Sequence, residues 1–189
     1  MFFEGAVLRL KYAIIGTGAC GGAIGGCLLQ SGCDVSFLAR SDYDDIHTNG
    51  LKVTNEALLE QMSHRVAVYK TMTDMPVCDV VILAVKSYAN QEILFSLKSI
   101  LNPSSVIIIL QNGLDIEKEI GRLYPDITQV ATVSWIKVAR NSPGTYQHVF
   151  GSEINAINYV HSRNEYSNTP TAANEIIIAD FAKAGFKLN

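Results

Sequence analysis

The sequence predicts an α/β protein with a doubly wound, mostly parallel sheet. Apolar runs alternate with segments of helical periodicity along most of the chain, which is the element order of that fold class. Two runs, CDVVILAV at 78–85 and SSVIIIL at 104–110, are almost continuously apolar, as expected of parallel strands covered on both faces. The first run, YAIIG at 12–16, ends in a glycine-rich turn that opens a helix.

The first three elements form one strand–helix–strand unit. A strand at 12–16 is followed by a helix at 19–30, which Ser31-Gly32 closes, and by a second strand at 34–39. The unit has the size of a βαβ motif.

The remaining elements continue the alternation. Strands are expected at 51–55 and 64–71, as a small hairpin excursion, and then at 78–85, 104–110 and 127–135, with helices at 89–99 and 113–124. Turn signals and alternating residues predict an antiparallel or edge pair at 142–160, then a loop at 163–170 and an amphipathic helix with the start of a strand at 171–186. We therefore expect an N-terminal extension at 1–10, the main domain at 11–168, and the last helix with a link at 169–189.

Composition narrows the classes of function. The 189 residues are 48% hydrophobic, enough for the core of one full domain. A net charge of −3 without charged blocks argues against nucleic acid or a membrane surface as a partner. No apolar run approaches the roughly 18–20 residues that span a bilayer, and the N-terminus lacks the basic region of a signal peptide. These features predict a cytoplasmic protein.

The metal-binding residue types show no ligand spacing. Cys20, Cys27, Cys33 and Cys78 match no zinc pattern, and the four histidines are scattered. We expect reduced, mostly packed thiols and no metal site.

The glycine-rich turn predicts a Rossmann-like dinucleotide site. In Gly16-x-Gly18-x-x-Gly21, the first glycine permits the tight turn, the second lets a pyrophosphate approach the backbone, and the third lets the helix pack closely on the strand. Free N–H groups and the helix dipole then favour the phosphates. The expected cofactor contacts of this turn are Gly16, Thr17, Gly18, Ala19, Cys20 and Gly21. The alternative is a turn used only for close packing.

The end of the second strand favours NADP over NAD. Arg40 stands where NAD-binding proteins usually carry an acidic residue, and a guanidinium can pair with a 2′-phosphate. Asp42 and Asp44 follow closely and complicate this interpretation. The alternative is a solvated arginine on the rim.

Polar residues also follow two later strands. Lys86 ends one apolar run, and Asn112, within Gln111-Asn112-Gly113, ends the next. Ligands of open α/β sheets bind outside the carboxyl ends of the strands, so both side chains are expected in the cofactor crevice. The alternatives are a lysine that extends to solvent and an Asn-Gly turn. Trp135, late in its strand, is expected to fill the core, and the alternative is that it lines the cleft.

These motifs together resemble the ketopantoate reductases (2-dehydropantoate 2-reductases). The resemblance rests on GTGACG at 16–21, LAR at 38–40, AVKSYAN at 84–90, LQNGLD at 110–115 and SPGTYQHVFG at 142–151, and it extends from about Lys11 onward. It implies NADPH-dependent reduction of the 2-oxo acid 2-oxopantoate to pantoate, for pantothenate and coenzyme A. It also implies that Lys86 contacts the cofactor near the substrate and that Asn112 binds both.

The resemblance further implies a second, helical domain after the AGF segment at 184–186. In the family that domain supplies the proton-donating lysine, whereas this sequence ends at Asn189. We therefore leave the general acid unassigned, and we expect the chain to bind cofactor with little turnover alone. We also expect exposed apolar surface that a homodimer would cover. The alternatives are another NADP-dependent 2-oxo or 2-hydroxy acid dehydrogenase, or a non-catalytic NADP-binding module.

Overall fold

The computed structural model describes residues 9–55, 58–168 and 172–189, so most of the expected N-terminal extension at 1–10 lies outside the described residues. The described strands are β1 (Lys11–Ile15), β2 (Asp34–Leu38), β3 (Leu51–Asn55), β4 (Leu58–His64), β5 (Ala67–Tyr69), β6 (Cys78–Leu83), β7 (Leu101–Ile109), β8 (Thr128–Ser142), β9 (Thr145–Val160), β10 (Glu165–Ser167) and β11 (Lys187–Leu188). The helices are α1 (Ala19–Gln30), α2 (Tyr43–Asn49), α3 (Asn90–Ile93), α4 (Ile116–Leu123) and α5 (Ala172–Lys183), with 3₁₀ segments at Met72–Asp74, Ser87–Ala89, Leu94–Ser99 and His161–Arg163.

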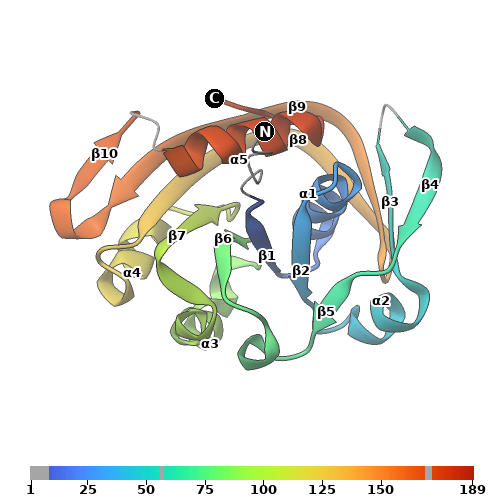
Figure 1. The fold of residues 1–189 in the computed structure, drawn as a ribbon, viewed down its shortest axis with the longest axis horizontal. Coiled ribbons are helices and arrows are strands. Elements are labelled where there is room, and N and C mark those ends of the chain that lie inside the picture. The colour runs from blue at the N-terminus through green and yellow to red at the C-terminus, as the bar shows by residue number, and fades with distance from the viewer. Residues whose placement is uncertain (1–8, 56–57, 169–171) are drawn as a thin grey trace, which may run out of the picture.

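The described strands form one mixed, mostly parallel sheet in the order β4-β3-β9-β8-β7-β6-β1-β2-β5, with β10 and β11 also paired to β9. Within the part of the sheet ordered β8-β7-β6-β1-β2-β5, all neighbouring strands are parallel to one another. Strands β8 and β9 form a long antiparallel hairpin. The sheet is curled, and Figure 1 shows β8 and β9 arching over α1, with α3 and α4 on the other side of the parallel strands. The predicted α/β fold with a Rossmann-like, mostly parallel sheet is confirmed.

Alternation along the parallel strands divides the buried residues into two cores. Tyr12 and Ile14 of β1 belong to the core that includes α1 and α5. Ala13 and Ile15 belong to the core on the opposite face, with α4 and the 3₁₀ segment Leu94–Ser99. Both faces of the sheet are therefore covered, which explains why β6 and β7 are continuously apolar in sequence.

Several glycines of helix α1 lie so close to neighbouring elements that no side chain would fit there. A Cβ atom on Gly21 would lie 2.0 Å from the Gly16 carbonyl oxygen, and one on Gly22 would lie 2.3 Å from the Tyr146 ring. On Gly25 it would lie 2.6 Å from the Phe37 ring. The close packing expected at Gly21 thus extends along one face of the helix.

Two expectations about the short elements were wrong. The hairpin partner of β3 is β4 rather than the segment 64–71. The strand that lies entirely within that segment is β5, and it pairs in parallel with β2 at the opposite edge of the sheet.

Helix α2, with a single buried residue, Ile46, was not predicted, because seven residues with one apolar contact leave almost no periodic signal.

The C-terminal half also differs in detail. The strand predicted at 127–135 continues to Ser142. The antiparallel or edge pair predicted at 142–160 is one strand, 145–160, which is antiparallel to β8 and lies between β3 and β8, not at the edge. The turn comes at Pro143-Gly144, where Gly144 has a φ of +69°. The expected loop at 163–170 contains β10, which pairs with β9. The helix of 171–186 and the strand start after it correspond to α5 and β11.

The contact between α1 and Tyr146 leads to a stability prediction. Gly22→Ala should lower the free energy of unfolding by about 1–3 kcal/mol, because the added methyl overlaps a buried ring. Gly18→Ala is the matched control, since a Cβ there meets nothing within 4 Å. Urea unfolding of both variants measures the difference, and equal stability of the two would contradict the packing described here.

Candidate cofactor crevice at the ends of the parallel strands

The glycine-rich turn after β1 leaves the start of α1 open. Gly16 has a φ of +103°, and a Cβ there would lie 2.6 Å from Val85 Cγ1, so only glycine fits. Gly18 is the N-cap of α1, and a Cβ there would enter open space. The helix has no side-chain cap and no acidic residue in its first turn. Its N–H groups and positive dipole end are therefore available to an anion.

The glycine turn is held from behind by Tyr146 of β9. The Tyr146 hydroxyl lies 3.0 Å from the Thr17 carbonyl oxygen and 2.6 Å from Oδ2 of Asp42, so its one proton has two acceptors. Arg140 of β8 donates to both carboxylate oxygens of Asp42, from Nε at 2.8 Å and from Nη2 at 2.6 Å. The β8–β9 hairpin is thus bonded both to the turn and to the segment after β2.

Asp42 is only 1% exposed and is ionised through this network. Burial would by itself raise the pKa of its carboxyl group, but hydrogen bonds from Arg140, Tyr146, Ser41 and the Gly144 N–H outweigh burial and hold the pKa well below its usual range. Burial raises the pKa of Tyr146, and the neighbouring Asp42 raises it further.

Arg40 is exposed and follows β2. The end of β2 lies beside the glycine turn, since the Gly16 N–H donates to the Leu38 carbonyl at 3.2 Å. The two acidic residues that complicated its interpretation have other partners. Asp42 is turned inward to Arg140, and Asp44 pairs with Lys70 at 3.0 Å. In the described contacts, both carboxylates therefore have cationic partners other than Arg40.

Lys86 and Asn112 are both exposed and follow successive parallel strands. That both side chains face the cofactor stays a prediction. Lys86 begins a 3₁₀ turn just after β6, and Asn112 follows β7. Burial raises the pKa of the Cys20 thiol, and the charge of Lys86 lowers it in part. Cys20 is in the first turn of α1, so the ammonium group of Lys86 acts close to the open helix end.

Gln111, a residue that the sequence did not single out, ties these strand ends together. Its Nε2 donates to the Val85 carbonyl and to Asn90 Oδ1, both at 2.8 Å, and Asn90 Nδ2 donates to Glu119 at 3.2 Å. Val85 in turn abuts Gly16. The glycine turn, the Lys86 turn and the Asn112 turn are therefore joined by direct contacts. The only sequence signal for Gln111 was its place beside Asn112.

Several large apolar side chains are exposed, two of them just after the ends of β6 and β7 and one within β8. Leu114 is 94% exposed, Tyr88 is 83% exposed and Trp135 is 67% exposed. The expectation that Trp135 fills the core was wrong, because the register of β7 with β8 ends at Ile109 and Ala131, and Trp135 pairs only with Glu153 of β9. Individual large apolar side chains are exposed here. That they form one surface, buried in a homodimer, stays a prediction.

The described residues were also compared with the features of membrane-spanning helices and of disulfide-bonded proteins. No described helix combines the length and apolar character needed to cross a membrane. The four cysteines, all within the described residues, form no disulfide; Cys27 and Cys78 are buried, and Cys20 and Cys33 are partly buried.

Comparisons with known proteins agree with this geometry. The family model "Ketopantoate reductase PanE/ApbA" matches residues 12–159. A 2-dehydropantoate 2-reductase of Nostoc sp. is 33% identical over 182 residues, which cover 94% of this chain and 55% of that protein. The chain thus spans about half the length of that relative.

Solved structures show the same similarity. The 2-dehydropantoate 2-reductase of Geobacter metallireducens has a TM-score of 0.81 and 28% identity, over 95% of this chain and 57% of that one. D-Mandelate dehydrogenase, solved with NADH and anilino(oxo)acetate, has a TM-score of 0.75 and covers 95% of this chain and 56% of that one. Its 20% identity supports the fold alone.

The ionised, buried Asp42 leads to a pH prediction. Asp42→Asn should lower the free energy of unfolding at pH 7 by about 1–3 kcal/mol, through the loss of charge-assisted hydrogen bonds. The folded pKa is depressed, so this contribution is complete above the ordinary aspartate pKa near 3.9. It is lost as pH falls below that value, because the unfolded chain then binds a proton that folded Asp42 does not.

Urea unfolding from pH 7 to pH 3 should show the gap between wild type and Asp42→Asn shrinking as the pH falls. Asp44→Asn is the control, because its partner Lys70 is exposed and the change should stay within about 0.5 kcal/mol. A gap that is constant over the whole pH range would contradict the assignment.

Proposed function

This chain belongs to the ketopantoate reductase family PanE/ApbA, and from that premise we propose that it is the NADPH-binding part of a cytoplasmic 2-dehydropantoate 2-reductase. The substrate would be 2-oxopantoate and the product pantoate, a precursor of pantothenate and coenzyme A. The curated relative from Nostoc sp. carries that name, and this chain covers 55% of its length. The activity is therefore proposed for the whole protein.

The observation that carries the proposal is the open, uncapped start of α1. Open space at Gly18 leaves room for a diphosphate against the backbone N–H groups of residues 18–21. Arg40, whose acidic neighbours are paired elsewhere, would bind the 2′-phosphate. The residues present therefore fit an anionic dinucleotide with an extra phosphate.

Lys86 and Asn112 would complete the site at the reactive end. When bound, NADPH supplies the hydride. Lys86 is suited to hold the carboxylate of a 2-oxo acid, and the Asn112 amide can donate to the keto oxygen or orient the cofactor. Gln111 would keep the two turns at a constant separation through Val85 and Asn90. The protein thus provides orientation and charge for the transfer.

The choice of NADPH is tested at Arg40. Arg40→Ala should weaken NADPH binding by about tenfold or more, which corresponds to the loss of a charge-assisted pair, and should leave NADH binding within about twofold. Titration of cofactor fluorescence measures both dissociation constants. Arg122→Ala, which removes an exposed arginine on α4, is the control. An equal preference for both cofactors in wild type, or no loss in the variant, would contradict the assignment.

A further prediction distinguishes the binding of NADPH from the reduction of 2-oxopantoate. Residues 1–189 should bind NADPH but reduce 2-oxopantoate at no more than a trace rate. Lys86 is proposed to hold the carboxylate, so protonation of the keto oxygen requires a further group, and general acid catalysis alone contributes about 10²–10⁴-fold. Absorbance at 340 nm follows NADPH oxidation. Sustained turnover by this chain would show that all catalytic groups lie within residues 1–189.

A further inference from the structure

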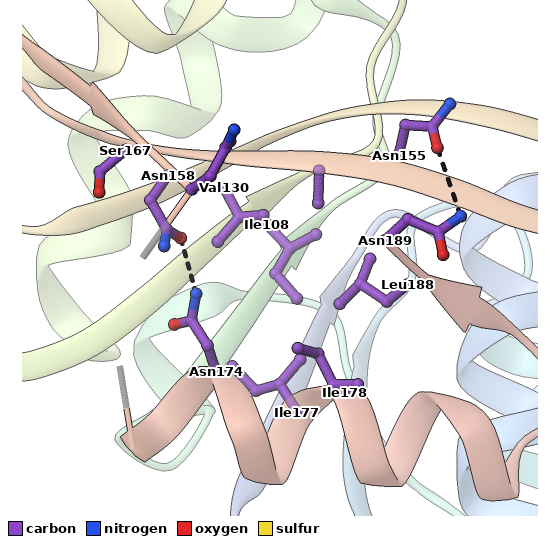
Figure 2. Close-up of a pocket in the computed structure, with 12 residues that line it drawn as sticks. Ile108, Val130, Asn155, Asn158, Ser167, Asn174, Ile177, Ile178, Leu188 and Asn189 are labelled. Carbon is purple, nitrogen blue, oxygen red and sulfur yellow. Dashed lines mark hydrogen bonds between the residues drawn. The ribbon is translucent and has the colours of Figure 1, made fainter. Parts of the chain in front are cut away.

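The buried polar contacts of the described residues differ in whether they carry charge. In a cavity of about 370 Å³ between α5, β9 and β11, the amides of Asn158 and Asn174 pair with each other at 2.8 Å (Figure 2). That pair is neutral and brings no net charge to the cofactor crevice. The pair of Arg140 and Asp42 is charged, and its carboxylate is only 1% exposed. Its effect on the crevice therefore depends on whether both partners are present.

The ion pair lies close to the glycine turn. The Tyr146 hydroxyl is 2.6 Å from Asp42 Oδ2 and 3.0 Å from the Thr17 carbonyl oxygen, so one hydroxyl group separates the carboxylate from the turn. Asp42 also follows Arg40 by two residues. Arg140 and Tyr146 are register partners across the β8–β9 hairpin, which explains why both reach the same carboxylate. The charge of this pair therefore acts in the segment that carries the proposed 2′-phosphate site.

The other donors to Asp42 are neutral. They are Ser41 Oγ at 2.8 Å, the Tyr146 hydroxyl and the Gly144 N–H at 3.3 Å. Hydrogen bonds to a carboxylate favour its charged form, so Asp42 would stay ionised without Arg140 but would lose its counter-charge. The unpaired negative charge would then act on a nearby phosphate, because charges in a protein interior are screened less than charges in water.

We propose that Arg140 is a specificity-determining residue, which sustains a preference for NADPH over NADH by neutralising Asp42 beside the 2′-phosphate site. This inference rests on the proposed function. The two cofactors share the diphosphate and differ in the 2′-phosphate, so a change of charge near Arg40 changes the ratio of their dissociation constants. A displaced glycine turn would instead weaken both cofactors alike, because the turn faces the part that they share.

The test measures the dissociation constants of NADPH and NADH for the 189-residue chain by cofactor fluorescence, in low-salt buffer. Arg140→Gln leaves Asp42 without its counter-charge and should lower the NADH-to-NADPH ratio of dissociation constants at least about threefold. Asp42→Asn leaves Arg140 as a surplus positive charge and should raise the ratio by a similar factor. The double variant removes both charges and should return the ratio to within about twofold of wild type.

Two further variants separate charge from structure. Arg140→Lys keeps the charge without the paired hydrogen bonds and should keep the ratio within about twofold of wild type. Arg122→Gln removes an exposed arginine on α4 and should leave the ratio unchanged. If Arg140→Gln does not fold, Asp42→Asn against the double variant gives the same test, because removal of the Arg140 charge should again lower the ratio at least about threefold.

The outcomes distinguish this inference from the proposed function. A wild-type chain without a preference for NADPH would overturn the cofactor assignment and the role of Arg140 together. With that preference present, the role of Arg140 alone is overturned if Arg140→Gln and Asp42→Asn shift the ratio in the same direction or leave it unchanged. An equal shift in Arg122→Gln would also overturn it, because the effect would then come from the overall charge of the chain.

Discussion

The placement of Tyr146 is the constraint on which the rest of the site depends. Its ring occupies the space that a side chain on Gly22 would need, and its hydroxyl contacts the Thr17 carbonyl and the Asp42 carboxylate. One residue of β9 therefore fixes how close α1 comes to the sheet and where the turn before α1 lies. The curl that brings β9 over α1 makes this contact possible, and Arg140 on the partner strand neutralises the buried charge that it involves.

The same network determines the electrostatic character of the crevice. Asp42, the nearest carboxylate after Arg40, is drawn into the interior by Arg140 and Tyr146, and Asp44 is paired with Lys70. In the proposed site the helix dipole, Arg40 and Lys86 would all favour an anion. Arg140 on the hairpin would thus favour anion binding indirectly, because it neutralises the negative charge of Asp42.

Local patterns were sufficient for the parts of the fold that repeat. The glycine turn, the first strand–helix–strand unit and the buried strands β6 and β7 were legible because each has a strong period or a defined turn residue. Strand pairing was not: the segment 64–71, predicted to pair with β3, contains β5, which pairs with β2 at the opposite edge of the sheet, and the true partner β4 was not predicted as a strand. The roles of Tyr146, Arg140 and Gln111 were also hidden, because each depends on partners far away in the chain. Trp135 was misplaced because its strand continues past the neighbour that would have covered it.

A crystal structure of this chain with bound NADPH tests the central claim most directly. The account predicts the diphosphate against the backbone N–H groups of residues 18–21, with the Thr17 carbonyl still on Tyr146 and the side chains of Lys86 and Asn112 turned toward the nicotinamide. A nucleotide bound elsewhere, or a glycine turn displaced from Tyr146 with Lys86 and Asn112 facing away, would contradict it.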